Sequence, residues 1–172
     1  GLVAARHLKH FGVPKVDVVY PKRPQKQLFE NLVTQCTEMN APVGDEVNAP
    51  LASYDVILDA VFGFSFRGAP RPPFDTLLKE LADTKTPLVS VDTPSGWDAE
   101  RGPPATGPVL RPQVLVSLTA PKKCAAFFIG RHYVGGRFVP PFIAEKYGLR
   151  LPPYPGVSQV LELEGWEGAG EG

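Results

Sequence analysis

Two aspartates lie at or near the ends of apolar runs, and turn residues follow each run at once. Asp59 lies in the run 56–62, and Asp92 ends the run 88–92. Both runs look like buried parallel strands that end at a ligand crevice. An ionised carboxylate in such a place loses hydration unless a cation, a hydrogen-bond donor or a substrate compensates it. The pair therefore predicts a small-molecule site, in which one carboxyl holds a cation and the other transfers protons.

The turn residues after each run add candidate ligands. The first run opens into a loop with glycines at 63 and 68 that permit tight turns near an anion, and Arg67 supplies a charged donor. The spacing matches neither the Walker A motif nor the dinucleotide fingerprint, so phosphate binding and an ordinary turn both stay open. Ser95 offers oxygen to a hard cation or, alternatively, caps a turn or helix.

Other polar residues carry weaker signals. Asp98 follows a glycine and a tryptophan and is predicted to be a turn or cap residue. Lys122 and Lys123 follow a predicted strand, so they either face the crevice or, as is commoner for lysine, lie in solvent. The histidines lack metal-ligand spacing and are predicted to lie on the surface: His7, His10 and His132.

Hydrophobic periodicity supplies the elements that would position these residues. Helical stripes are predicted in 2–11, 28–36 and 74–81, and strands in 16–20, 56–62, 88–92 and 114–118. This alternation predicts right-handed crossovers and a Rossmann-like three-layer α/β/α sandwich with a mostly parallel central sheet. Such sheets bind ligands beyond the carboxyl ends of their strands, where both aspartates are predicted. Short edge strands in 124–128 and 133–139 and a helix in 142–147 complete the prediction.

Composition limits the classes of partner. The chain has 172 residues, a length that fits one domain, and 43% of them are hydrophobic. Lys plus Arg and Asp plus Glu both count 18, which gives no electrostatic footprint for nucleic acid or an anionic membrane. An uninterrupted apolar run of about 18 residues is absent, so no membrane span is predicted. Cys36 and Cys124 are predicted to be reduced core thiols.

The ends of the chain suggest its domain organisation. Gly1 leads directly into a helical pattern without an N-cap or a preceding strand, so an N-terminal part is expected to be missing. We predict one domain in 1–154. The stretch 155–172 is predicted to be a disordered tail.

Four motifs in order, 56–68, 90–98, 117–123 and 130–141, closely resemble the NAD(P)H-hydrate epimerase family, also called the apolipoprotein A-I-binding protein family. The resemblance covers the chain to about residue 154. It implies an isomerase of nicotinamide nucleotide repair that interconverts the R and S forms of hydrated NADH and NADPH. A dehydratase specific for the S form would then restore the reduced cofactor.

The resemblance also implies the roles of individual residues. It assigns Asp59 and Ser95 to one potassium ion. Asp92 would contact the substrate and is our candidate acid and base. Family members carry a further glycine-rich loop upstream of the helix that matches 2–8, and this chain begins after it. The implied substrate-binding residues are Gly63, Phe64, Ser65, Phe66, Arg67, Gly68, Ala69 and Asp92.

Partners and compartment are likewise expectations from the resemblance. It implies a homodimer in the mitochondrion or cytoplasm, and animal relatives suggest apolipoprotein A-I as a second partner. The leading alternative is a noncatalytic dimerisation or protein-binding module of the same fold. Retention of Asp59 and Asp92 argues against that module, because a scaffold has no need of two costly carboxylates. A nicotinamide-dependent dehydrogenase is disfavoured because no G-x-G-x-x-G motif follows a strand.

Overall fold

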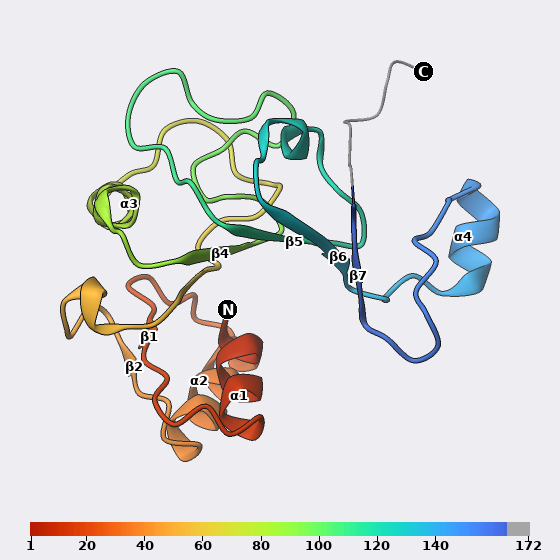
Figure 1. Cartoon of the computed structure of the whole chain (residues 1–172). Helices are drawn as coiled ribbons and strands as arrows, with labels where there is room; N and C mark the ends of the chain where they lie inside the picture. The colour runs from red at the N-terminus through yellow and green to blue at the C-terminus, as the bar shows by residue number, and fades with distance from the viewer. Residues whose placement is uncertain (165–172) are drawn as a thin grey trace. The chain divides into compact units, whose positions relative to one another are not determined.

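The structure is a computed structural model of the chain, and it describes residues 1–164. The chain forms two compact units, one of Gly1–Tyr54 and one that begins at Asp55 (Figure 1). Each unit has its own sheet. The elements of each unit are described separately.

The first unit packs two helices with a pair of parallel strands. The helices are α1 (Leu2–His10) and α2 (Gln27–Glu38), and the strands are β1 (Val18–Val19) and β2 (Val43–Gly44). A 3-10 helix, η1 (Leu51–Ser53), lies near the end of the unit. Apolar stripes on α1 and α2 meet in a small core. That core comprises Ala5, Cys36 and Ala41, with Leu2, Val16, Val18 and Val43 packed against it.

The second unit is built on a five-stranded sheet in the order β3-β4-β5-β6-β7. Strands β3 to β6 run parallel, and β7 is antiparallel to β6. This is the predicted Rossmann-like α/β class with a mostly parallel sheet. The strands are β3 (Ile57–Asp59), β4 (Leu88–Val91), β5 (Val114–Leu118), β6 (Arg131–Gly135) and β7 (Val160–Glu162).

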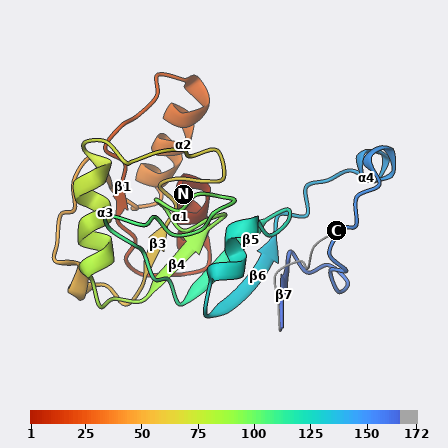
Figure 2. The same cartoon turned by 90° about the horizontal axis from the view of Figure 1, so that it is seen from above.

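Three helical segments connect these strands. In both views α4 lies beyond β7, past one edge of the sheet, whereas α3 lies toward the other end of the strand order (Figures 1 and 2). Pro141 starts α4 at a position that needs no amide donor, and Gly148 ends it with a left-handed φ of 59°. The segments are α3 (Phe74–Asp83), the 3-10 helix η2 (Lys123–Phe127) and α4 (Pro141–Tyr147).

The core of this unit is formed by apolar residues of α3, of the central strands and of the loops between them. Leucines from α3 and alternate positions of β4 and β5 are almost fully buried, and each fully buried leucine contributes about 1.5–3 kcal/mol relative to an exposed one. The buried apolar residues include Leu78, Leu81, Leu88, Leu110, Leu115, Cys124 and Val134. Both cysteines are buried free thiols, as predicted.

Three predictions beyond residue 118 are wrong. Residues 124–128 were expected as an edge strand, but η2 occupies this stretch because Ala125 and Phe128 close i,i+3 hydrogen bonds. Part of the expected disordered tail 155–172 is strand β7, which pairs along β6 and joins it through the Arg131–Glu162 ion pair of 2.9 Å. The remaining part of that tail, 165–172, lies outside the described residues. The strand expected at an edge in 133–139 is β6 (Arg131–Gly135), which is an interior strand because β7 pairs with it.

Candidate functional site

The candidate site forms where three parallel strands end at one edge of the sheet. Asp59 is the last residue of β3, Asp92 directly follows β4, and Thr119 directly follows β5. The backbone N–H of Asp92 donates to the carbonyl of Val116 at 2.8 Å, so the ladder reaches as far as the second aspartate. The carboxyl ends of adjacent parallel strands thus present both predicted aspartates at the same edge, as expected for a ligand site in an open α/β sheet.

Asp59 is a buried carboxylate held by donors from the neighbouring strand. Only 1% of the residue is exposed. Its Oδ2 accepts the hydroxyl of Ser90 at 2.7 Å and the backbone N–H of Ser95 at 2.9 Å. Its Oδ1 accepts a long bond of 3.5 Å from the N–H of Val61, and the side chain of Ser95 is a further partner of the carboxyl group. Burial raises the pKa of Asp59, and the bonds from Ser95 and Ser90 offset part of that rise.

Ser95 connects the two loops that leave β3 and β4. Besides donating its N–H to Asp59, it accepts the N–H of Phe62 on its hydroxyl oxygen at 2.9 Å. The serine is 1% exposed, so its oxygen is fixed next to the carboxylate. The structure therefore brings together the two residues that the sequence predicted as ligands of one cation. It adds Ser90, whose role is invisible in the sequence because it stands inside an apolar strand.

Asp92 is held in an unusual backbone conformation beside the loop after β3. Its φ is 72°, a left-handed value that non-glycine residues seldom adopt and that is often found at functional sites. Its Oδ2 accepts the N–H of Phe64 at 2.8 Å. A Cβ at Gly63 would lie 2.8 Å from that same oxygen, so glycine is needed for this close approach. Only 8% of Asp92 is exposed.

The predicted substrate loop 63–69 is partly stabilised by its own residues. Arg67 donates from Nη1 to the carbonyls of Phe64 and Phe66 at 2.9 and 3.0 Å. The rings of Phe62 and Phe66 stack with centroids 4.2 Å apart. Phe64, in contrast, is 59% exposed beside Asp92. The other members of the set are placed on the same loop, with exposed positions at Ser65, Gly68 and Ala69.

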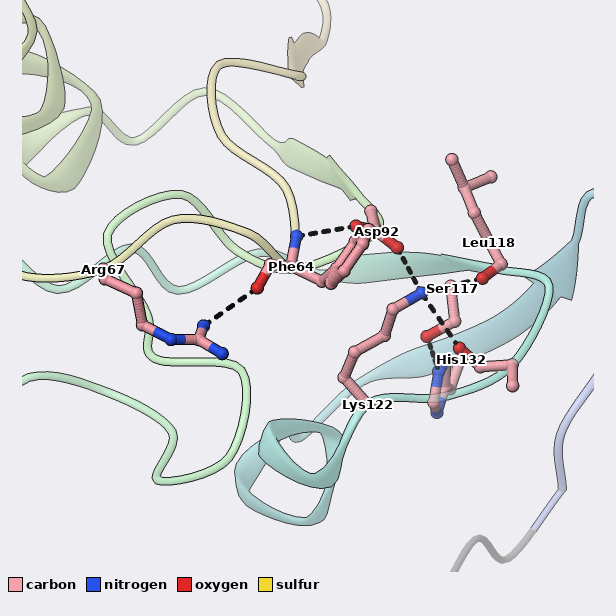
Figure 3. A network of polar contacts seen from close by, with 8 residues as sticks. Phe64, Arg67, Asp92, Ser117, Leu118, Lys122 and His132 are labelled. Carbon is pink, nitrogen blue, oxygen red and sulfur yellow. Dashed lines mark hydrogen bonds and ion pairs between the residues drawn. The ribbon is translucent and has the colours of Figure 1, made fainter.

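Lys122 completes the surroundings of Asp92. Its Nζ forms an ion pair with Asp92 Oδ1 and donates to the carbonyls of Leu118 and Ala120 at 2.7 and 3.2 Å (Figure 3). The sequence left open whether the lysines face the site or lie in solvent, and the structure places Lys122 against Asp92. Lys123 is exposed. The sequence could not show which of these adjacent lysines faces Asp92, because they lie outside the predicted helices and strands, where periodicity would indicate the direction of each side chain.

Asp98 has the turn role that was predicted for it. Its Oδ1 accepts the N–H groups of Glu100 and Arg101, both at 2.9 Å. These bonds lower the pKa of Asp98. Its carboxylate therefore stabilises its own turn.

His132 is buried, so the prediction that it lies on the surface is wrong. It occupies β6, is 5% exposed, and its Nε2 lies 2.9 Å from the hydroxyl oxygen of Ser117 on β5 (Figure 3). β5 and β6 are neighbouring parallel strands, and both side chains are buried. Burial lowers the pKa of His132, because it disfavours the imidazolium.

The burial of His132 predicts that stability falls in mild acid. An unfolded histidine has a pKa of about 6.5, and the folded state binds fewer protons below that pH, so the contribution of His132 is present above about pH 6.5 and is lost as the pH falls. His132→Gln should therefore show a smaller loss of stability than the wild type between about pH 7.5 and pH 5.5. Urea denaturation at both pH values measures this difference. Equal losses in the two proteins would contradict the assignment.

The donor atoms at the site indicate which kind of metal ion could bind there. Among residues 1–164, no group of three or more His, Cys, Asp or Glu side chains is placed to hold a metal ion. Asp59 and Ser95 instead offer oxygen atoms, which hard cations prefer.

No helix within residues 1–164 is both long and apolar enough to cross a bilayer.

Comparison with known proteins identifies the family. Residues 1–124 match the family model described as YjeF-related protein N-terminus. The NAD(P)H-hydrate epimerase of Neurospora crassa is 50% identical over 165 residues, which cover 95% of this chain and 70% of the relative. The relative of that name in Puccinia graminis f. sp. tritici is 50% identical over 169 residues, or 98% of this chain and 70% of its own length. The crystal structure of yeast ynu0, YNL200c, superposes with a TM-score of 0.84 at 41% identity, covering 94% of this chain and 71% of the yeast chain. The predicted resemblance is confirmed, and this chain belongs to the YjeF-related protein N-terminus family.

Proposed function

We propose that this chain is an NAD(P)H-hydrate epimerase, an isomerase that interconverts the R and S forms of hydrated NADH and NADPH. The observation that carries the proposal is the carboxylate of Asp92 at the sheet edge, held by the N–H of Phe64 and the ammonium of Lys122. Relatives that are about half identical over nearly the whole chain carry the name of this activity. A strand-end acid that can give and recover one proton is the group that the reaction needs.

The chemistry requires one proton to move twice. Protonated Asp92 gives its proton to the hydroxyl on carbon 6 of the hydrated ring, and the carbon–oxygen bond breaks as water leaves. The lone pair of the ring nitrogen forms the double bond of a planar iminium. Water then adds to either face of carbon 6, and the carboxylate of Asp92 takes the proton that this water releases. Because Asp92 gives one proton and takes one back, the enzyme is unchanged after each turnover. The configuration at carbon 6 is inverted whenever water adds to the face opposite the one it left.

The substrate ring would lie against the loop 63–69. Phe64 presents an exposed ring next to Asp92, and a flat apolar face suits a reduced nicotinamide ring. The remaining residues of the loop would contact the rest of the dinucleotide. Arg67 already donates to two carbonyls of the loop, so its first role is to hold the loop's shape.

A potassium ion fits the residues around Asp59. The carboxylate is almost fully buried, and the partners of its two oxygens are neutral hydroxyl and N–H groups of Ser90, Ser95 and Val61. An uncompensated buried carboxylate is costly, and a cation bound to it would remove that cost. We assign Asp59 and Ser95 as its ligands. When bound, the ion would supply positive charge that offsets the phosphates of the substrate.

The proposal also implies a second enzyme that acts on the product in nicotinamide nucleotide repair. The product S form must be consumed by a dehydratase, because epimerisation alone restores no reduced cofactor. The homodimer, the mitochondrial or cytoplasmic compartment and the apolipoprotein A-I partner stay predictions. The noncatalytic module stays the alternative, and the experiment that follows separates the two.

The test supplies purified R-hydrate of NADH together with an S-specific dehydratase in excess. Return of NADH absorbance then reports the rate at which R is converted to S. We expect the protein to increase this rate above spontaneous epimerisation, in proportion to its concentration. A rate equal to the spontaneous one, measured with folded protein, would favour the binding module.

A further inference from the structure

Lys122 has a more defined position than a lysine in a surface loop usually has. Its side chain is 20% exposed and that of its partner Asp92 is 11% exposed. An ammonium group has three N–H donors and no acceptor. Three acceptors surround it here, namely one oxygen of Asp92 and the carbonyls of Leu118 and Ala120. Two of these contacts are hydrogen bonds to backbone carbonyls, and the third is an ion pair with the carboxylate.

The backbone after β5 produces this position. Thr119 has a left-handed φ of 68°, and its N–H donates to the carbonyl of Gly135 at 2.7 Å. The chain turns sharply there, so that the side chain of Lys122 returns to the end of the strand that precedes it. Its Nζ also lies 5.7 Å from the centre of the Phe64 ring. The lysine thus connects the loop after β5 to the two loops that hold Asp92.

Asp92 is consequently fixed through both of its oxygens. Oδ1 faces the ammonium of Lys122, and Oδ2 accepts the N–H of Phe64 (Figure 3). Two charged or polar donors on opposite oxygens determine the rotation of the carboxyl group. The ammonium also stabilises the carboxylate that remains after Asp92 has given its proton. Pairs as little exposed as this one are screened less by salt than surface pairs.

We propose that Lys122 is a positioning residue for the epimerisation, which holds Asp92 in its reactive orientation and stabilises its carboxylate form. This inference rests on the proposed function. Lys122 acts through Asp92 and not on the substrate, because its ammonium is held by the ion pair with Asp92 and by hydrogen bonds to two backbone carbonyls. Its loss should therefore slow the chemical step and leave substrate binding nearly unchanged.

The experiment compares Lys122→Met, Lys122→Arg and Lys122→Gln with Lys123→Met as the matched control. Methionine keeps much of the stem and removes the charge, and Lys123 is the exposed neighbour. We expect Lys122→Met to lower kcat by about 10- to 100-fold, since misplacing a group by 1 Å can cost about 10²-fold. KM should change by less than about twofold, because binding energy common to ground and transition states is retained. Lys122→Arg should recover part of kcat, and Lys123→Met should match the wild type.

The outcomes separate this inference from the proposed function. A wild type no faster than the spontaneous reaction would refute the epimerase itself. An active wild type with an inactive Asp92→Asn and an unchanged Lys122→Met would overturn only the role of Lys122. Lys122→Arg no better than Lys122→Met would contradict the role of its charge. If Lys122→Met does not fold, Lys122→Gln decides: it keeps a donor without the charge, and a wild-type kcat in that variant would overturn the inference.

Discussion

Asp92→Asn is expected to lower kcat for the conversion of R- to S-hydrate by about 10²- to 10⁴-fold, the usual contribution of a general acid–base group. Asparagine has nearly the same shape, and its amide oxygen can still accept the N–H of Phe64. It cannot transfer the proton, and it offers no charge to Lys122. Binding should therefore persist while turnover is lost. Steady-state kinetics with the coupled dehydratase measures both quantities.

Asp98→Asn provides the matched control for this variant. Asp98 is a carboxylate of the same loop, but it accepts two N–H groups of its own turn. Its substitution should leave kcat unchanged, because the amide oxygen of asparagine can still accept both N–H groups. If Asp92→Asn turned over substrate as fast as Asp98→Asn, the acid–base role of Asp92 would be untenable.

The sequence predicted the site best where strand periodicity determines position. Residues 114–118 were predicted as a strand, and β5 has those bounds. The apolar run 88–92 correctly placed Asp92 at a strand end, whereas the strand predicted in 56–62 ends three residues earlier, at Asp59. Adjacent parallel strands then bring Ser95 against Asp59. These features follow from local patterns and from the general geometry of parallel sheets.

The missed features depend on contacts between distant residues. The proximity of Lys122 to Asp92 follows from a sharp turn at Thr119, whose left-handed φ has no sequence signature at a threonine. His132 was predicted on the surface because its contacts, with Ser117 on β5 and with the ring of Phe128, have no signature in the sequence. β7 itself has only three residues, and a short polar-flanked strand resembles a loop until its partner is known.

The environment of Asp59 predicts a potassium-dependent stability that Asp59→Asn should abolish. A ligand that binds only the folded state stabilises it by about 2.7 kcal/mol when its concentration is 100 times Kd. For a protein of this length, that free energy corresponds to a rise in Tm of roughly 5–10 °C. The wild type should therefore melt at a higher temperature in potassium chloride than in lithium chloride of equal ionic strength, which controls for screening.

The Asp59→Asn variant distinguishes the effect of potassium binding from the effect of the hydrogen bonds that support the fold. Its amide oxygen can still accept the donors from Ser90 and Ser95, but without the negative charge it is a weak partner for a cation. Its Tm should thus be the same in both salts, and its KM for the hydrate should rise, because the charge that offsets the phosphates is lost. Calorimetry in the two salts measures the first effect and the coupled assay the second. A wild-type Tm that did not distinguish potassium from lithium would remove the ion from this site, and Asp59 would then be a structural carboxylate stabilised by Ser90 and Ser95 alone.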